Sequence, residues 1–143
     1  SFSLSSKQAC SNIDLKTPNL DHRVQAIRKL QMKGHQVAIH LDPIIWTTNW
    51  AEEYGRLCEY LYDNIKLQNV AYISLGVVRF TDDVYYQFQK NYPNSIINQG
   101  ELKRSFDNKI RYPKALRNKM LNYINDTLIS KGVNSEIIYK CME

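Results

Sequence analysis

A histidine and an aspartate two residues apart, His40 and Asp42, are the pair of side chains in this sequence best suited to chemistry. In a β-strand, residues i and i+2 face the same way, so the imidazole and the carboxylate would share one surface. Such a pair can act as a base with its carboxylate partner, or provide two ligands of a metal ion. A metal site needs a third ligand, and His22 and His35 stand in surface-like positions. Asp42 also precedes Pro43, so the alternative is a turn in which its carboxylate accepts hydrogen bonds from nearby backbone amides.

Polar side chains recur in the same phase on two neighbouring segments. Ser3 and Ser5 alternate with apolar residues near the start of the chain, and Ser74 does so farther along. Ligand sites of α/β barrels lie at the carboxyl ends of the strands, where several strands each contribute a side chain. We therefore expect Ser3, Ser5, His40, Asp42 and Ser74 to converge on one concave surface and to bind a cofactor. The alternative is a solvated sheet face that merely tolerates polar residues.

The segments that carry these side chains alternate between strand and helix patterns. Strands are expected over 2–5, 36–42, 70–75 and 136–141. Helices are expected between Asn19 and Gly34, over about 49–63, from Thr81 or Asp82 to before Pro93, and from near Pro113 to Gly132. The order predicts an α/β fold of parallel βαβ units, with helices on the outer face and a C-terminal helix and strand. Residues 1–143 carry no linker or repeat, so a single domain is expected.

Composition restricts the class of protein. The 143 residues carry a net charge of +5, and no apolar run is long enough for a membrane span. Cys10, Cys58 and Cys141 lie far apart, which argues against a disulfide framework or a short-spaced metal site. Reduced thiols, and hence a cytoplasmic location, are expected. The sequence contains no phosphate-binding glycine loop, nucleophile elbow or HExxH motif.

Much of the positive charge falls in one polar connection. Between Lys103 and Lys119, seven basic residues face only Asp107. Basic clusters on irregular segments are typical of nucleic-acid contact, although a solvated basic surface would look the same.

Several runs in combination resemble the spore photoproduct lyase family of radical S-adenosylmethionine enzymes. The runs are His40-Leu41-Asp42-Pro43-Ile44-Ile45, Tyr72-Ile73-Ser74-Leu75-Gly76-Val77-Val78-Arg79-Phe80, Asp107-Asn108-Lys109-Ile110-Arg111-Tyr112 and the two ends of the chain. The resemblance implies a partial TIM-like barrel of six βα units, of which this chain would form the C-terminal half. It also implies that Ser3 lies close to S-adenosylmethionine (AdoMet) and that Asp42 lies near its adenosine. Lys109, Arg111 and Tyr112 would contact DNA, the last two as an Arg-Tyr pair at the lesion.

One departure from the family is large. The family holds a 4Fe-4S cluster with three cysteines in a CxxxCxxC loop, and no such loop occurs in these 143 residues. We therefore expect a fragment of a radical AdoMet lyase that acts on DNA, as in the repair of thymine lesions, with the isolated chain inactive. The alternative is a non-catalytic half-barrel module that binds nucleic acid or a partner protein.

A half barrel leaves its first strand as an exposed edge. The natural partner of that edge is the remaining half of the barrel. The sequence therefore predicts that the isolated chain either self-associates through 2–5 or covers this edge with its C-terminal segment.

Overall fold

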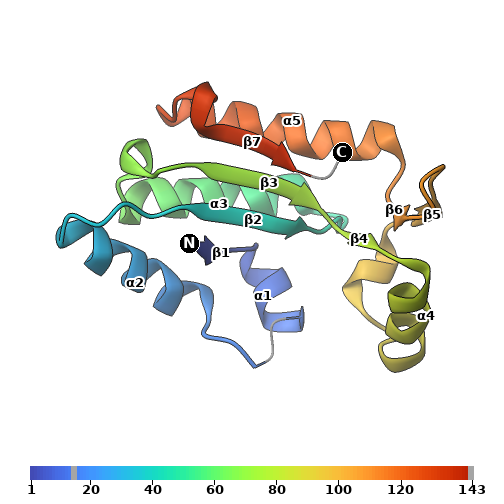
Figure 1. Ribbon diagram of the computed structural model, residues 1–143. Helices are drawn as coiled ribbons and strands as arrows, with labels where there is room; N and C mark the ends of the chain where they lie inside the picture. The colour runs from blue at the N-terminus through green and yellow to red at the C-terminus, as the bar shows by residue number, and fades with distance from the viewer. Residues whose placement is uncertain (14–15, 142–143) are drawn as a thin grey trace.

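The computed structural model describes residues 1–13 and 16–141, which form two sheets and five helices of more than one turn (Figure 1). The strands are β1 (Phe2–Ser3), β2 (Ile39–Ile44), β3 (Ile73–Val77), β4 (Arg79–Phe80), β5 (Lys103–Arg104), β6 (Ile110–Arg111) and β7 (Ile138–Cys141). The helices are α1 (Lys7–Ile13), α2 (Leu20–Met32), α3 (Trp50–Asn64), α4 (Asp82–Asn91) and α5 (Lys114–Ser130).

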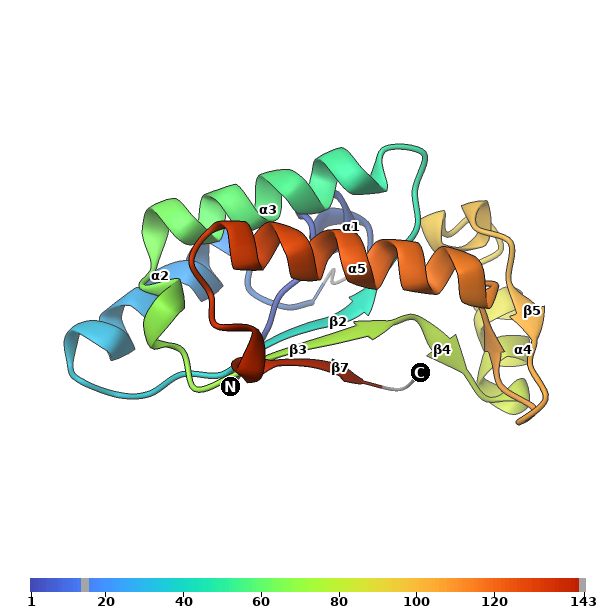
Figure 2. The same ribbon diagram turned by 90° about the horizontal axis from the view of Figure 1, so that it is seen from above.

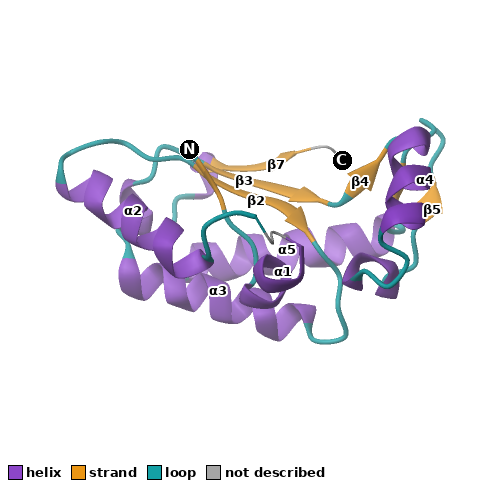
Figure 3. Ribbon diagram, turned by 90° about the horizontal axis from the view of Figure 1, so that it is seen from below, coloured by secondary structure: helices purple, strands orange, loops and turns teal. Residues whose placement is uncertain are grey.

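The main sheet is parallel throughout, with the strand order β1-β2-β3-β7. Helices α1, α2, α3 and α5 all lie on one side of this sheet, and its other face stays open (Figures 2 and 3). The predicted α/β fold with parallel strands and helices on one face is therefore confirmed. No helix in the described part of the chain has the length and apolar character needed to cross a membrane.

The core lies between the sheet and its helices. Leu41 and Leu75 are paired across β2 and β3 and are fully buried. They belong to the same hydrophobic cluster as Tyr54 and Leu61 of α3 and Ile124 of α5. Because alternate residues of a strand point to opposite faces, burial of these leucines directs the residues between them to the open face.

The helix boundaries follow local signals. Asn19 caps α2, because its side-chain oxygen accepts a hydrogen bond from the His22 backbone N–H at 2.9 Å. Gly34 follows the helix with a φ of 81°, a left-handed conformation that glycine adopts without steric cost. The predicted stop is therefore confirmed.

The polar connection after α4 contains more structure than the sequence suggested. Strands β4, β6 and β5 form a small antiparallel sheet, in which β5 and β6 are the two arms of a hairpin. Together with α4 this sheet stands beyond the carboxyl ends of β2 and β3 (Figure 1). The helix α1 was also not predicted.

The predicted coverage of the first edge by the C-terminal segment is wrong. β7 pairs with β3, from Ile73 with Ile138 to Gly76 with Cys141, at the opposite edge from β1. Instead, a side chain of α2 reaches the β1 edge: the Arg23 guanidinium donates to the Ser3 carbonyl oxygen at 2.8 Å.

Candidate functional site

A row of polar side chains crosses the open face of the main sheet. The strand register places Ser3 beside His40, His40 beside Ser74, and Ser74 beside Tyr139. His40 Nδ1 lies 2.5 Å from Ser74 Oγ, and the Tyr72 hydroxyl lies 3.5 Å from His40 Nε2. The imidazole is thus held between two hydroxyl groups, an arrangement that can orient the ring and accept or donate a proton.

Aromatic rings continue this row toward β7. Tyr72 makes edge-to-face contacts with His40 on one side and with Tyr139 on the other, at centroid distances of 5.5 and 6.0 Å. Tyr139 remains largely exposed. The open face therefore carries an aromatic strip in addition to its hydrogen-bonding groups, and such a strip can pack against the planar ring of a ligand.

Asp42 lies closer to the carboxyl end of β2, on the same face as His40. Its carboxylate occupies the space above Gly76 of β3, where a Cβ atom would come within 2.7 Å of Asp42 Cγ. Burial raises the pKa of Asp42 above its usual 3.8, while the positive charges of His40 and Arg79 act to lower that pKa. A half-buried carboxyl group of this kind suits the recognition of ligand hydroxyl or amino groups.

A small cavity of about 90 Å³ joins the ends of β1 and β2 and includes Ser3, Ser5 and Asp42 in its wall. The expectation that the Ser5 hydroxyl faces the open surface is nevertheless wrong. β1 ends at Ser3, so the alternation stops there, and Ser5 Oγ lies 3.3 Å from the Tyr54 hydroxyl in the helix layer. That hydroxyl also accepts a hydrogen bond from the Ile45 N–H, and burial raises the pKa of Tyr54 to about 12.

The predicted DNA-contacting pair is buried. Arg111 is 3% exposed and donates to Ser105 Oγ at 3.0 Å and to the Asp107 carboxylate at 2.9 Å, inside its own hairpin. Tyr112 is fully buried, and its hydroxyl accepts a hydrogen bond from the Trp46 N–H at 3.2 Å. A buried phenol ring cannot stack on a base, so the prediction that Arg111 and Tyr112 meet DNA directly is wrong for this conformation.

The exposed aromatic of the hairpin is a residue that the sequence analysis missed. Phe106 lies in the turn between β5 and β6 and is 99% exposed. Beside it, Asn108 adopts a φ of 56°, and asparagine is one of the few residues that favour this conformation in hairpin turns. The Asp107-Asn108 dipeptide was the signal that could have identified a hairpin with Phe106 in its turn.

The basic side chains of the hairpin are less free than their number suggests. Lys103 pairs with Glu101 at 2.9 Å, and Arg104 pairs with Asp82 at the start of α4. Lys109 is partly buried and makes no ion pair with any described residue. Of the three predicted nucleic-acid contacts, Lys109 is therefore the one that the structure leaves available.

Comparison with protein families decides the relationship. The sequence profile of the family described as "Spore photoproduct lyase" matches residues 1–139. The chain belongs to the spore photoproduct lyase family. The resemblance that the sequence motifs implied is thereby confirmed.

Two curated spore photoproduct lyases match the chain. The enzyme of Bacillus subtilis (strain 168) is 30% identical over 108 residues, and that of Geobacillus sp. (strain Y412MC61) is 23% identical over 107 residues. Each alignment covers 73% of this chain and 31% of the relative. The chain thus spans about a third of the length of the relatives it matches.

Solved structures of spore photoproduct lyase share the fold. A double mutant of that enzyme with bound AdoMet and dinucleoside spore photoproduct matches with a TM-score of 0.79 and 18% identity, over 97% of this chain and 42% of that protein. The enzyme complexed with dinucleoside spore photoproduct matches with a TM-score of 0.75 and 17% identity, over the same shares.

The family's 4Fe-4S cluster, whose CxxxCxxC loop does not occur in this sequence, has no candidate ligand set among residues 1–13 and 16–141. No group of three His, Cys, Asp or Glu side chains in this part of the chain could hold a metal ion. Cys10 and Cys58 are buried and unbridged, and Cys141 is partly exposed. These residues therefore do not fit a 4Fe-4S cluster.

Proposed function

We propose that this chain is part of a radical AdoMet enzyme that acts on damaged DNA, and that it supplies one wall of the partial barrel in which AdoMet and the lesion bind. The observation that carries the proposal is the set of Ser3, His40, Ser74 and Asp42 on the open face of the parallel sheet. The fold of this sheet matches that of an enzyme whose structure holds AdoMet and the dinucleoside lesion.

The open-face residues suit AdoMet by their chemistry. AdoMet presents ribose hydroxyls, an amino group and an adenine ring. The Asp42 carboxylate can accept hydrogen bonds from hydroxyl or amino groups. The Ser3 hydroxyl can both donate and accept a hydrogen bond. The aromatic strip of Tyr72 and Tyr139 offers a flat apolar surface. When bound, AdoMet would supply the radical chemistry of the family, with its reduction carried by a cluster whose ligands lie outside the described residues.

Nucleic acid would meet the β5–β6 hairpin through Phe106. The hairpin stands beyond the carboxyl ends of the main strands, the same end of the sheet at which Asp42 lies (Figure 1). An exposed aromatic ring can stack on an unpaired base, and Lys109 can meet a phosphate. Arg111 and Tyr112 would then act indirectly, because they hold the hairpin and its connection in place.

AdoMet binding tests the open-face site. We expect calorimetric titration to detect AdoMet binding, and Asp42→Asn to weaken it about tenfold, or about 1.4 kcal/mol, because a charge-assisted hydrogen bond becomes a neutral one. Asp63→Asn serves as the matched control, because Asp63 lies in the last turn of α3, in the helix layer on the other side of the sheet. Equal affinities of the wild type and Asp42→Asn would exclude Asp42 from the site.

Oligonucleotide binding tests the hairpin. Phe106→Ala should cost about 1–3 kcal/mol for a single-stranded oligonucleotide, with an unchanged salt dependence, because stacking is lost. Lys109→Met should reduce the slope of log affinity against log salt concentration by about one, because one phosphate contact is lost. The control is Tyr86→Ala, which removes another exposed aromatic ring, on α4.

The pattern of outcomes separates two functions. Oligonucleotide binding that depends on Phe106, together with no AdoMet binding, would replace the enzyme proposal by the non-catalytic binding module. Identical oligonucleotide affinities of the wild type, Phe106→Ala and Lys109→Met would remove nucleic acid from this surface.

A further inference from the structure

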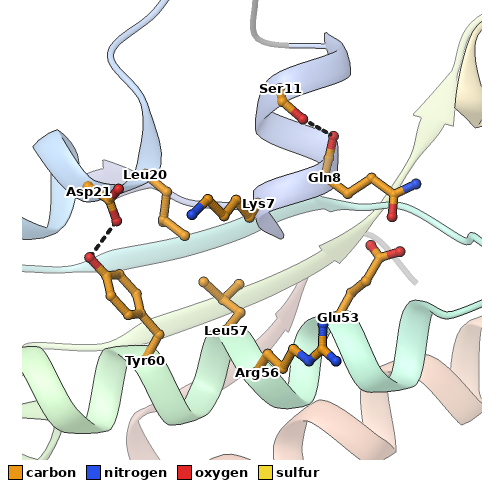
Figure 4. A pocket seen from close by; sticks show the side chains of 9 residues that line it. All are labelled: Lys7, Gln8, Ser11, Leu20, Asp21, Glu53, Arg56, Leu57 and Tyr60. Carbon is orange, nitrogen blue, oxygen red and sulfur yellow. Dashed lines mark hydrogen bonds between the residues drawn. The ribbon is translucent and has the colours of Figure 1, made fainter.

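A second cavity lies on the helix side of the main sheet, away from the open face. It measures about 580 Å³ and is bounded by α1, the first turn of α2 and one side of α3 (Figure 4). This volume lies in the range of sites for small organic ligands. The cavity shares no residue with the AdoMet or hairpin surfaces, so a ligand bound there would be independent of the proposed function.

The centre of this helix-side cavity is apolar. Leu20 of α2 and Leu57 of α3 approach it from neighbouring helices and belong to the hydrophobic core, at 6% and 2% exposure. The Tyr60 ring closes one end (Figure 4). These leucines connect the cavity wall to the hydrophobic core, so a ligand with an apolar group could pack against core side chains.

The carboxylates around the cavity already have protein donors. Asp21 Oδ1 accepts the Tyr60 hydroxyl hydrogen bond at 2.6 Å. Both oxygens of Glu53 are used as well: Oε1 accepts from Thr47 Oγ1 at 2.8 Å and Oε2 from Ser6 Oγ at 3.0 Å. Glu53 is thus held in the fold through both oxygens, and Asp21 through one.

The donors around the cavity are available. Lys7 extends from α1 across the cavity toward Leu20, and its ammonium group makes no hydrogen bond or ion pair with any described residue (Figure 4). The Gln8 side-chain amide is likewise unbonded within the described chain. Arg56 lies along the opposite wall and pairs with Glu52, one turn earlier on α3.

We propose that this cavity binds a small organic anion with an apolar body. The anionic group, a carboxylate or a phosphate monoester, would lie at the Lys7 ammonium, at the Leu20 end of the cavity (Figure 4). The apolar part would lie between Leu20 and Leu57. Lys7 is an exposed residue, and its ammonium group lies beside the apolar wall formed by Leu20. A cation next to an apolar surface favours such an amphiphile over either a simple salt ion or a neutral hydrocarbon.

Ligand titrations followed by amide NMR test the proposal on the full chain. The probes are octanoate, octyl phosphate and the uncharged octanol. We expect octanoate or octyl phosphate to shift the amide signals of α1, residues 20–21 and residues 53–60, and the stronger of the two identifies the preferred head group. Octanol should bind at the same place at least fivefold more weakly.

Two variants separate the head-group contact from the apolar contact. Lys7→Met keeps an apolar stem and should weaken the anions at least fivefold while leaving octanol unchanged; Lys119→Met, on the exposed side of α5, is the control. Ser11→Trp, at the exposed mouth, should weaken all three probes by filling the space. Shifts scattered over the surface, or anion affinities that Lys7→Met leaves unchanged, would overturn the proposal.

Discussion

At the scale of single residues, the open face depends on a missing side chain. Gly76 leaves the space that the Asp42 carboxylate fills, since any Cβ atom there would come within 3.0 Å of all three carboxylate atoms. The carboxylate therefore lies against β3, partly removed from water, and interacts electrostatically with His40 and Arg79. Its electrostatic environment is set by one glycine on the neighbouring strand.

This placement predicts a pH-dependent stability. Burial raises the folded-state pKa of Asp42 above 3.8, so the folded state binds more protons than the unfolded state between 3.8 and that raised pKa. The contribution of Asp42 to stability is then present at low pH and falls as pH rises through this window. Asp42→Asn should be more stable than the wild type at pH 7, and the gain should vanish near pH 3.

Urea denaturation at both pH values measures this difference. Asp63→Asn, which removes an exposed carboxylate, controls for the change in net charge. A loss of stability in Asp42→Asn at pH 7 would show instead that the attraction of His40 and Arg79 outweighs the desolvation of the carboxylate.

At the scale of elements, the sequence predicted the longer strands, whose side chains alternate, and missed the two-residue strands of the small antiparallel sheet. The alternation in 36–42 and 70–75 placed His40 and Ser74 correctly side by side on one face, because successive side chains of a strand point to opposite faces along its whole length. β5 and β6 have two residues each, too few for any period, so the hairpin was not recognised. Ser5 was misplaced for the same reason, since β1 ends before it.

The hydrogen-bond partners of Arg111 and Tyr112 could not be predicted from the sequence either. Arg111 is buried because Asp107 and Ser105 fold back on it, and Tyr112 because the loop after β2 passes over its hydroxyl. A basic residue beside an aromatic one looks like a surface pair when read along the chain. Only the long-range contact between Tyr112 and Trp46 shows that the pair has a structural role.

That contact gives a prediction for the element it anchors. Tyr112→Phe keeps the packed ring but removes the acceptor of the Trp46 N–H at 3.2 Å. A buried donor left without a partner costs about 1–3 kcal/mol, so the free energy of unfolding should fall by that amount. Tyr86→Phe, on an exposed ring, should change it by less than about 0.5 kcal/mol. Equal stabilities of the two variants would mean that water replaces the lost acceptor.

At the scale of the whole molecule, the outer edge of β1 has no neighbouring strand among the described residues. The N–H groups of Phe2 and Leu4 donate to the carbonyl oxygens of Ala38, just before β2, and His40, so the backbone N–H and C=O of Ser3 face outward. Arg23 covers the Ser3 carbonyl oxygen and is fixed there by a second bond, from Nε to the Pro18 oxygen at 2.7 Å. A charged side chain on an edge is one way in which proteins limit strand addition.

Self-association through this edge stays a prediction, and Arg23 gives a way to test it. Arg23→Ala frees the Ser3 carbonyl, so the variant should form more dimer or larger species than the wild type in light scattering at matched concentrations. Arg28→Ala, an exposed arginine farther along α2, should behave as the wild type does. A monomeric Arg23→Ala would exclude the β1 edge as a route to association.

The position of β3 has a consequence for how the molecule opens. β3 is buried at all five positions and has a hydrogen-bonded strand on each side, whereas β1 contributes two residues bonded along one edge. Local unfolding therefore spreads inward from β1, and amide protons of β3 should be among the last to exchange with solvent. Ser74 belongs to this slowest region, while Ser3 belongs to the fastest strand of the sheet. We therefore expect the two ends of the polar row to differ in amide exchange rate, with His40 between a slowly exchanging partner, Ser74, and a faster one, Ser3.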